Sequence, residues 1–137
     1  MTLNWQECKK HLHQVRPDQN KVKSLQKMCS VRQRMIAAIP IDEETASLLV
    51  ADYYEIMKEL LTALLLQQGF KSANHECLIT FFEHTHSSYV YEIKMLRQLK
   101  DIRNRVLYDG LFVRKEYLIR NQLEFNHLIK LLHHHLG

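Results

Sequence analysis

Only three glycines and two prolines interrupt the 137 residues of this chain, so few positions favour a turn. Hydrophobic residues make up 46% of the sequence and charged residues 25%, and Leu, Lys, Glu and Gln, which favour helices, are common. A chain of this length suits one domain with a substantial core. The composition therefore predicts a single all-α domain over residues 1–137.

Apolar residues recur at helical spacing, and the few turn-forming residues fall between the segments that carry this pattern. Pro17, Pro40, Gly69 and Gly110 are expected to end or separate helices. The expected helices cover about residues 4–15, 21–38, 45–68, 74–86, 90–109 and 115–136.

Short connections between these segments favour antiparallel neighbours. We therefore expect an up-and-down bundle of four or five helices over residues 20–136, with residues 1–16 forming a short extra N-terminal helix. The segment that ends at Gln68 should be the most buried helix, because apolar side chains follow one another at helical steps along it and cluster near its end. These side chains are Leu49, Tyr53, Ile56, Leu60 and Leu64.

Charge and cysteine content limit the possible environments. A net charge of +4 and a pI near 9.0 are compatible with an anionic partner such as RNA or a nucleotide. Cys8, Cys29 and Cys77 are odd in number and lack CxxC spacing, so the sequence predicts neither a disulfide framework nor a thiolate zinc site. No signal peptide or membrane-spanning run is recognisable, and we expect a soluble, cytoplasmic protein.

The polar residues with the clearest functional pattern close the segment that ends at Gly110. Arg103 and Asn104 are followed after three residues by Tyr108, and Asn104 and Tyr108 lie four residues apart on one helical face. Arginine is a permanently charged, planar donor suited to phosphate, and the amide and phenol can hydrogen-bond a ligand. Arg103, Asn104 and Tyr108 are therefore the candidate binding residues.

This pattern resembles the HEPN domains, small helical bundles whose signature is Arg-Asn followed after four to six residues by His. Here Tyr108 stands where that His would fall, giving the Arg-Asn-x-x-x-Tyr form that is similar to archaeal members. The resemblance continues upstream through Asp52-Tyr53-Tyr54-Glu55, Gly69-Phe70-Lys71-Ser72 and His75-Glu76-Cys77, and it covers roughly residues 20–136.

The resemblance implies a homodimer in which two Arg-bearing helices face a shared cleft. In active members, His acts on the RNA 2′-hydroxyl and Arg stabilises the phosphate; only Arg103 and Asn104 correspond here. Tyrosine is a poor general base at neutral pH because its ordinary pKa is near 10. The sequence therefore favours binding of RNA or a nucleotide over hydrolysis, and if the protein is active Arg103, Asn104 and Tyr108 are its catalytic candidates.

Four further residues are candidates for the binding site. Asp52, Glu55 and Glu59 lie on the helix expected to face Arg103, and the resemblance implies that an acidic residue pairs with that arginine; the sequence leaves open which one. For each, solvation of the outer helix face is an alternative. His75 lies at an expected helix start within the family-like stretch, where capping or a surface role is the alternative.

Basic residues interleave with apolar ones before the motif, so one face of this helix is expected to be basic: Lys94, Arg97, Lys100, Arg103 and Arg105. In a dimer, two such faces could attract a phosphate backbone with marked salt dependence. A histidine tract covers residues 133–135, but adjacent helical positions point in different directions, so no metal site is predicted. No cofactor is expected.

Three alternatives to RNA or nucleotide binding remain open. The protein could be a metal-independent endoribonuclease, possibly a toxin. It could be an interaction module that partners a small nucleotidyltransferase, as many HEPN domains do. It could also be a purely structural bundle in which Arg103 only joins protomers.

Overall fold

The computed structural model describes residues 2–137, and in this part of the chain nearly all regular structure is helical. The helices are Trp5–Cys8 (α1), the 3-10 turn Lys9–His11 (η1), Gln19–Ala37 (α2), Ala46–Gln67 (α3), His75–Thr85 (α4), Val90–Asp109 (α5) and Lys115–Leu136 (α6). Two short strands, His13–Gln14 (β1) and Phe70–Lys71 (β2), pair antiparallel.

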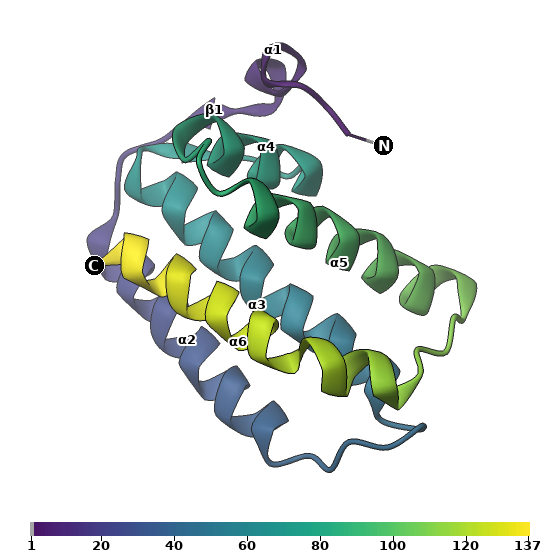
Figure 1. Cartoon of the computed structure of the whole chain (residues 1–137). Coiled ribbons are helices and arrows are strands. Elements are labelled where there is room, and N and C mark those ends of the chain that lie inside the picture. The colour runs from purple at the N-terminus through teal and green to yellow at the C-terminus, as the bar shows by residue number, and fades with distance from the viewer. Residues whose placement is uncertain (1) are drawn as a thin grey trace.

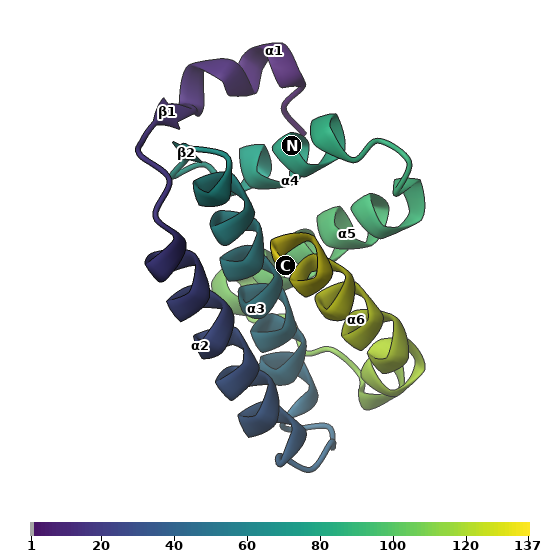
Figure 2. The same cartoon turned by 90° about the vertical axis from the view of Figure 1, so that its left-hand side faces the viewer.

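α3 forms the centre of the bundle and packs against α2, α4, α5 and α6 (Figures 1 and 2). The successive long helices α2, α3, α5 and α6 alternate in direction, and the shorter α4 lies near the end that carries α1 and the strands (Figure 1). The prediction of an all-α up-and-down bundle with a short N-terminal helix is confirmed.

Local sequence signals explain where the helices begin and end. Asp18 caps α2 by accepting a hydrogen bond from the Lys21 backbone N–H at 3.1 Å, and Asn74 caps α4 in the same way. Gly110 ends α5 in the left-handed conformation, with φ of 69°, which glycine adopts without a Cβ clash. The predicted bounds of α2 to α6 therefore agree with the structure to within about two residues.

The core lies on α3, most of whose residues are buried, as expected for a helix covered on several sides. The predicted inward residues of α4 and α6 are buried too, apart from the half-buried Leu136. The helical spacing of apolar residues also predicts that Ile39 and Val90 point inward, and this is wrong, because Val90 is 72% and Ile39 is 40% exposed. Val90 is the first residue of α5, and Ile39 lies two residues beyond the last residue of α2, so both are at helix ends.

The predicted N-terminal helix over residues 4–15 is too long. A capping box between Asn4 and Glu7 starts α1, but the chain becomes extended at Leu12, with φ of −93° and ψ of 128°. The backbone then pairs with β2, so that His13 lies opposite Lys71. Pairing with a distant strand overrides the helical spacing of Trp5, Leu12 and Val15.

The expectation that no disulfide forms is also wrong. Cys8 and Cys77 are joined by a disulfide across 69 positions of sequence, with their Cα atoms 5.3 Å apart. Spacing along the chain could not predict this bond, because it depends on how the N-terminal segment packs on α4. Cys29 remains a free, buried thiol.

A buried hydrogen bond fixes the connection between α5 and α6. The Val113 backbone N–H donates to Oγ of Ser47, near the start of α3, at 2.7 Å. This contact ties the segment after Gly110 to the central helix.

No helix within residues 2–137 combines the length and apolarity needed to span a bilayer.

Candidate functional site

Arg103 on α5 faces Glu55 on α3 and is held by it. Nε and Nη2 of the guanidinium both donate to Oε1 of Glu55, at 3.0 and 2.6 Å. The Arg103 side chain is 12% exposed and the Glu55 side chain 22% exposed, so this ion pair is largely shielded from water. Of the three carboxylates considered from the sequence, Glu55 is the partner of Arg103.

Two further side chains complete the surroundings of the guanidinium. Nη1 of Arg103 donates to Oδ1 of the adjacent Asn104 at 3.1 Å. Cζ lies 5.9 Å from the centre of the Tyr54 ring, a distance at which a cation is attracted by the aromatic face. Tyr54 was not among the residues predicted for the site. Its position next to Glu55, which places an aromatic ring beside a carboxylate, is the sequence feature that could have indicated it.

Lys58 extends this charged group along α3. Its ammonium lies 2.8 Å from Oε2 of Glu55 and 3.7 Å from Oε1 of Glu59. Burial alone would raise the pKa of Glu55, but hydrogen bonds and charges from Lys58 and Arg103 hold that pKa below its ordinary value. Glu55 is therefore ionised at neutral pH, and Glu59 is linked to the site only through Lys58.

Asp52 lies away from this group, on the side of α3 that faces α2. It borders a pocket of about 240 Å³ whose other lining residues include Arg32, Met35 and Glu55. Burial raises the pKa of Asp52, with a further increase from the Glu55 charge and an opposing effect of Arg32. No hydrogen bond or ion pair in the described chain joins Asp52 to Arg103.

His75 is the first residue of α4 and is half-buried. Capping of this helix is done by its neighbour Asn74, whose Oδ1 accepts from two backbone N–H groups. Burial lowers the pKa of His75, and the positive charges of Lys58 and Arg103 lower it further. The imidazole is therefore neutral at pH 7 and lies within the electrostatic reach of the Arg103 group.

Tyr108 is not part of this group. Its side chain is 75% exposed, and within residues 2–137 no hydrogen bond or ring contact joins it to Arg103 or Asn104. Asn104 instead turns its amide oxygen to Arg103. The structure thus brings together Arg103, Asn104 and Glu55, with Lys58 and Tyr54 around them, and leaves Tyr108 in solvent.

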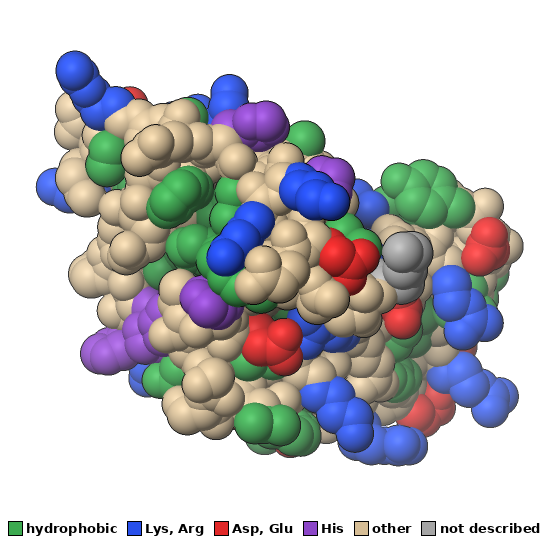
Figure 3. Space-filling view, turned by 90° about the horizontal axis from the view of Figure 1, so that it is seen from above, with side chains coloured by type: hydrophobic (Ala, Val, Ile, Leu, Met, Phe, Trp, Pro, Cys, Tyr) green, Lys and Arg blue, Asp and Glu red, His purple; other side chains and the backbone are tan. Residues whose placement is uncertain are grey.

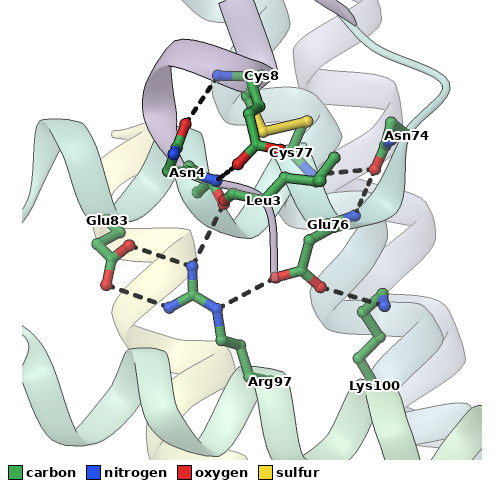
Figure 4. Close-up of polar contacts among 11 residues, drawn as sticks. Leu3, Asn4, Cys8, Asn74, Glu76, Cys77, Glu83, Arg97 and Lys100 are labelled. Atoms are coloured by element: carbon green, nitrogen blue, oxygen red, sulfur yellow. Dashed lines mark hydrogen bonds and ion pairs between the residues drawn. A yellow bond between two sulfur atoms is a disulfide. The ribbon is translucent and has the colours of Figure 1, made fainter. Parts of the chain in front are cut away.

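The basic face predicted for α5 is largely neutralised. Arg97 binds Glu76 and Glu83 at 3.2 and 3.1 Å, and Lys100 binds the other oxygen of Glu76 at 3.1 Å (Figure 4). Together with the Arg103 pair, three of the five predicted cations have carboxylate partners. On the face in Figure 3, which looks onto the end that carries α1 and α4, acidic and basic side chains are interspersed.

The structure gives no sign of a metal centre. Within the described residues, no group of three or more His, Cys, Asp or Glu side chains is placed to hold an ion. In the C-terminal tract, Nε2 of His135 lies 3.1 Å from the Tyr89 hydroxyl, and its ring packs edge-on against that of His86, 4.3 Å between centres. These contacts dock the end of α6 on the start of α5.

The fold and the site define an all-α bundle with a shielded arginine–carboxylate pair between its central helix and α5. Comparisons with protein-family models, with curated proteins and with solved structures find no match for this chain.

Proposed function

We propose that this chain is a HEPN-like, RNA- or nucleotide-binding homodimer of the cytoplasm, in which Arg103 and Asn104 contact the phosphate in a cleft between two protomers. The observation that carries the proposal is the fixed position of the Arg103 guanidinium. Its Nε and Nη2 are held by Glu55 and its Nη1 by Asn104. An acidic partner for this arginine is what the sequence resemblance implied.

The guanidinium keeps donors for a ligand. Arginine has five N–H groups, and the three hydrogen bonds from Arg103 use one on each nitrogen. One N–H on Nη1 and one on Nη2 remain, and the guanidinium fork can donate such groups to phosphate oxygens. Because the fork is already oriented, little side-chain entropy is lost on binding.

The charges around the site set the expected strength and salt dependence. Arg103, Lys58, Glu55 and Glu59 carry two positive and two negative charges, so the group has no net charge. Binding must therefore depend on oriented hydrogen bonds more than on a positive field. We expect a shallow decrease of affinity with salt, in contrast to the marked dependence expected from the sequence.

Fluorescence anisotropy with a labelled single-stranded RNA tests this function. Arg103→Ala should weaken binding about tenfold or more, the loss of one charge-assisted phosphate contact. Arg105→Ala is the matched control, because Arg105 is exposed on the same helix and makes no ion pair within the described chain. Circular dichroism should show that both variants are folded. Equal affinities of the two variants and the native chain would contradict the proposal.

Sedimentation equilibrium tests the dimer separately. The native protein should sediment as a dimer at micromolar concentration, and a monomer at all concentrations would rule out a cleft between protomers.

The endoribonuclease alternative is favoured by one observation. His75, with its lowered pKa, is neutral at pH 7 and can accept a proton, and it lies near the charges of Arg103 and Lys58. RNA cleavage without added metal, lost in both Arg103→Ala and His75→Gln, would support the enzyme; intact RNA after incubation with the native protein excludes it.

A further inference from the structure

The N-terminal segment, residues 2–16, has a single fully buried side chain. Cys8 is fully buried, whereas every other residue of this segment is exposed or only half-buried. Since burial of apolar area is the main source of stability, a segment with so little burial binds weakly by itself. Its one buried residue is the one that is cross-linked to α4.

Most noncovalent contacts of the segment lie close to water, although Trp5, Leu12 and Val15 are partly buried against the core and the Val15 N–H donates to the Gly69 carbonyl at 2.8 Å. The Thr80 hydroxyl donates to the Leu3 carbonyl at 2.8 Å, and the Trp5 ring stacks on His84, with centres 3.9 Å apart and planes 8° from parallel. Strands β1 and β2 pair over two residues each, and all but the half-buried Phe70 are exposed. Such contacts open and close readily unless a covalent bond holds the ends together.

The cross-link joins the segment to an ion-pair cluster between α4 and α5. Cys77 follows Glu76, which binds both Arg97 and Lys100 (Figure 4). The Thr80 hydroxyl that binds Leu3 also accepts from Nη2 of Arg97 at 3.3 Å. Attachment of the segment therefore covers one edge of this cluster, and release exposes it to solvent.

The third cysteine cannot replace either partner of the disulfide. Cys29 lies in α2, with its thiol directed to the Ile56 carbonyl at 3.6 Å. Burial raises its pKa to about 11, with a smaller contribution from Glu59, so little thiolate forms at neutral pH. Thiol exchange is thus confined to the pair Cys8 and Cys77.

We propose that the Cys8–Cys77 disulfide is a redox-controlled clasp that holds residues 2–16 on α4 when oxidised and releases them when reduced. Cys8 and Cys77 are both fully buried, so reduction requires a local opening of the segment; one thiolate of a dithiol then attacks a sulfur of the pair and forms a mixed disulfide. The second thiolate then displaces the remaining protein thiolate. Two electrons and two protons pass to Cys8 and Cys77, and the dithiol becomes a cyclic disulfide.

Such a clasp fits a protein of the cytoplasm. Disulfides that form where thiols are normally reduced are usually transient and act in catalysis or in redox sensing. The clasp is independent of the proposed RNA site, because Arg103 and Glu55 make no contact with residues 2–16 in the described structure.

Trp5 reports directly on the clasp, since it is the single tryptophan of the chain. Stacking on His84 should quench its fluorescence, and treatment of the native protein with dithiothreitol should increase the emission and shift it to longer wavelength. Cys8→Ser/Cys77→Ser should show the reduced spectrum with and without dithiothreitol. Cys29→Ser is the matched control and should respond as the native chain does.

Limited trypsin digestion supplies a second measurement. Lys9 and Lys10 are exposed in the segment, and cleavage after them should be about tenfold or more faster in the reduced protein, with the released peptide identified by mass. Far-UV circular dichroism should change little. Equal emission and equal cleavage in both redox states would overturn the proposal, as would loss of the helical signal on reduction, which would make the bond a requirement for the whole fold.

Counting thiols in the denatured protein tests the bond itself. Air-oxidised protein should have one reactive thiol, and reduced protein should have three, in agreement with one disulfide and one free cysteine. Three thiols after oxidation would show that the clasp does not form.

Discussion

Nε and Nη2 of Arg103 share a single oxygen of Glu55, while the other oxygen of Glu55 binds Lys58 at 2.8 Å. One carboxylate thus joins two cations, one on its own helix and one on α5. Removal of Glu55 should leave both cations without their main partner.

Glu55→Gln should lower the free energy of unfolding at pH 7 by about 1–3 kcal/mol, as for a hydrogen-bonded charge that is largely shielded. The pKa of Glu55 is lowered in the folded state. The stabilisation that ionised Glu55 contributes is therefore fully present above the pKa of the unfolded state, about 4.3. It is lost as the pH falls through the lower pKa of the folded state. Urea denaturation should show a difference between native and variant protein at pH 7 that shrinks towards pH 3; a difference independent of pH would contradict this account.

Tyr54→Phe should leave stability unchanged or raise it by up to about 1 kcal/mol, because the buried hydroxyl has no hydrogen-bond partner in the described structure. The ring beneath Arg103 is retained. Tyr53→Phe is the control: the Tyr53 hydroxyl accepts from Nε2 of Gln122 at 3.4 Å, so its removal should be slightly destabilising. Both are measured by thermal unfolding, and a clear loss in Tyr54→Phe would reveal a partner for the hydroxyl.

Ser47→Ala should lower the free energy of unfolding by about 1–3 kcal/mol, because it leaves the buried Val113 N–H without an acceptor. Ser88→Ala, at an exposed position, should have little effect. Urea denaturation of the two variants separates the loss of the Ser47–Val113 hydrogen bond from the general effect of replacing serine by alanine. Equal stabilities would show that the Val113 N–H finds another acceptor.

Gly69→Ala should be more destabilising than Gly110→Ala. Both glycines have positive φ, 86° and 69°, which costs alanine about 1–2 kcal/mol. A Cβ at Gly110 meets no atom within 4 Å, whereas a Cβ at Gly69 would lie 3.2 Å from the Val15 carbonyl oxygen. Val15 also donates to the Gly69 carbonyl at 2.8 Å, so it cannot easily move away. Equal costs in urea denaturation would show that the Val15 segment yields.

Acidification should weaken the docking of the end of α6. Burial lowers the pKa of His135, and the neighbouring His86 and His134 lower it further. The unfolded chain therefore binds a proton more readily, so stability is complete above about pH 6.5 and declines as the pH falls below it. His135→Gln should reduce this decline between pH 7 and pH 5, while His127→Gln, at an exposed position of α6, should not. Identical pH profiles for both variants would exclude His135 as the titrating group.

The helices could be predicted from the sequence because their signals are local. Gly69 and Gly110 ended α3 and α5, Pro40 followed α2, and the bounds expected for α6 match those observed. The N-terminal segment could not be predicted in this way. Its strand and its disulfide depend on Lys71 and Cys77, which are more than 50 residues away.

The arginine–carboxylate pair could be predicted only in part. Asp52, Glu55 and Glu59 lie three and four residues apart, so helical periodicity places all of them on related faces of α3. Which carboxylate meets Arg103 depends on the rotation of α3 relative to α5, and this rotation is set by core packing. The pairing of Arg97 with Glu76 and Glu83 could not be predicted from the sequence either, because it depends on how α4 packs against α5.

The paired cations of α5 have a consequence for selectivity. Arg97, Lys100 and Arg103 each have a carboxylate neighbour already, so a polyanion meets little uncompensated positive charge on these side chains. Nonspecific nucleic acid should therefore bind this helix only weakly. A ligand that binds there must fit the oriented hydrogen-bond donors. We therefore expect this surface to select among anionic ligands by shape, even though the chain as a whole is basic.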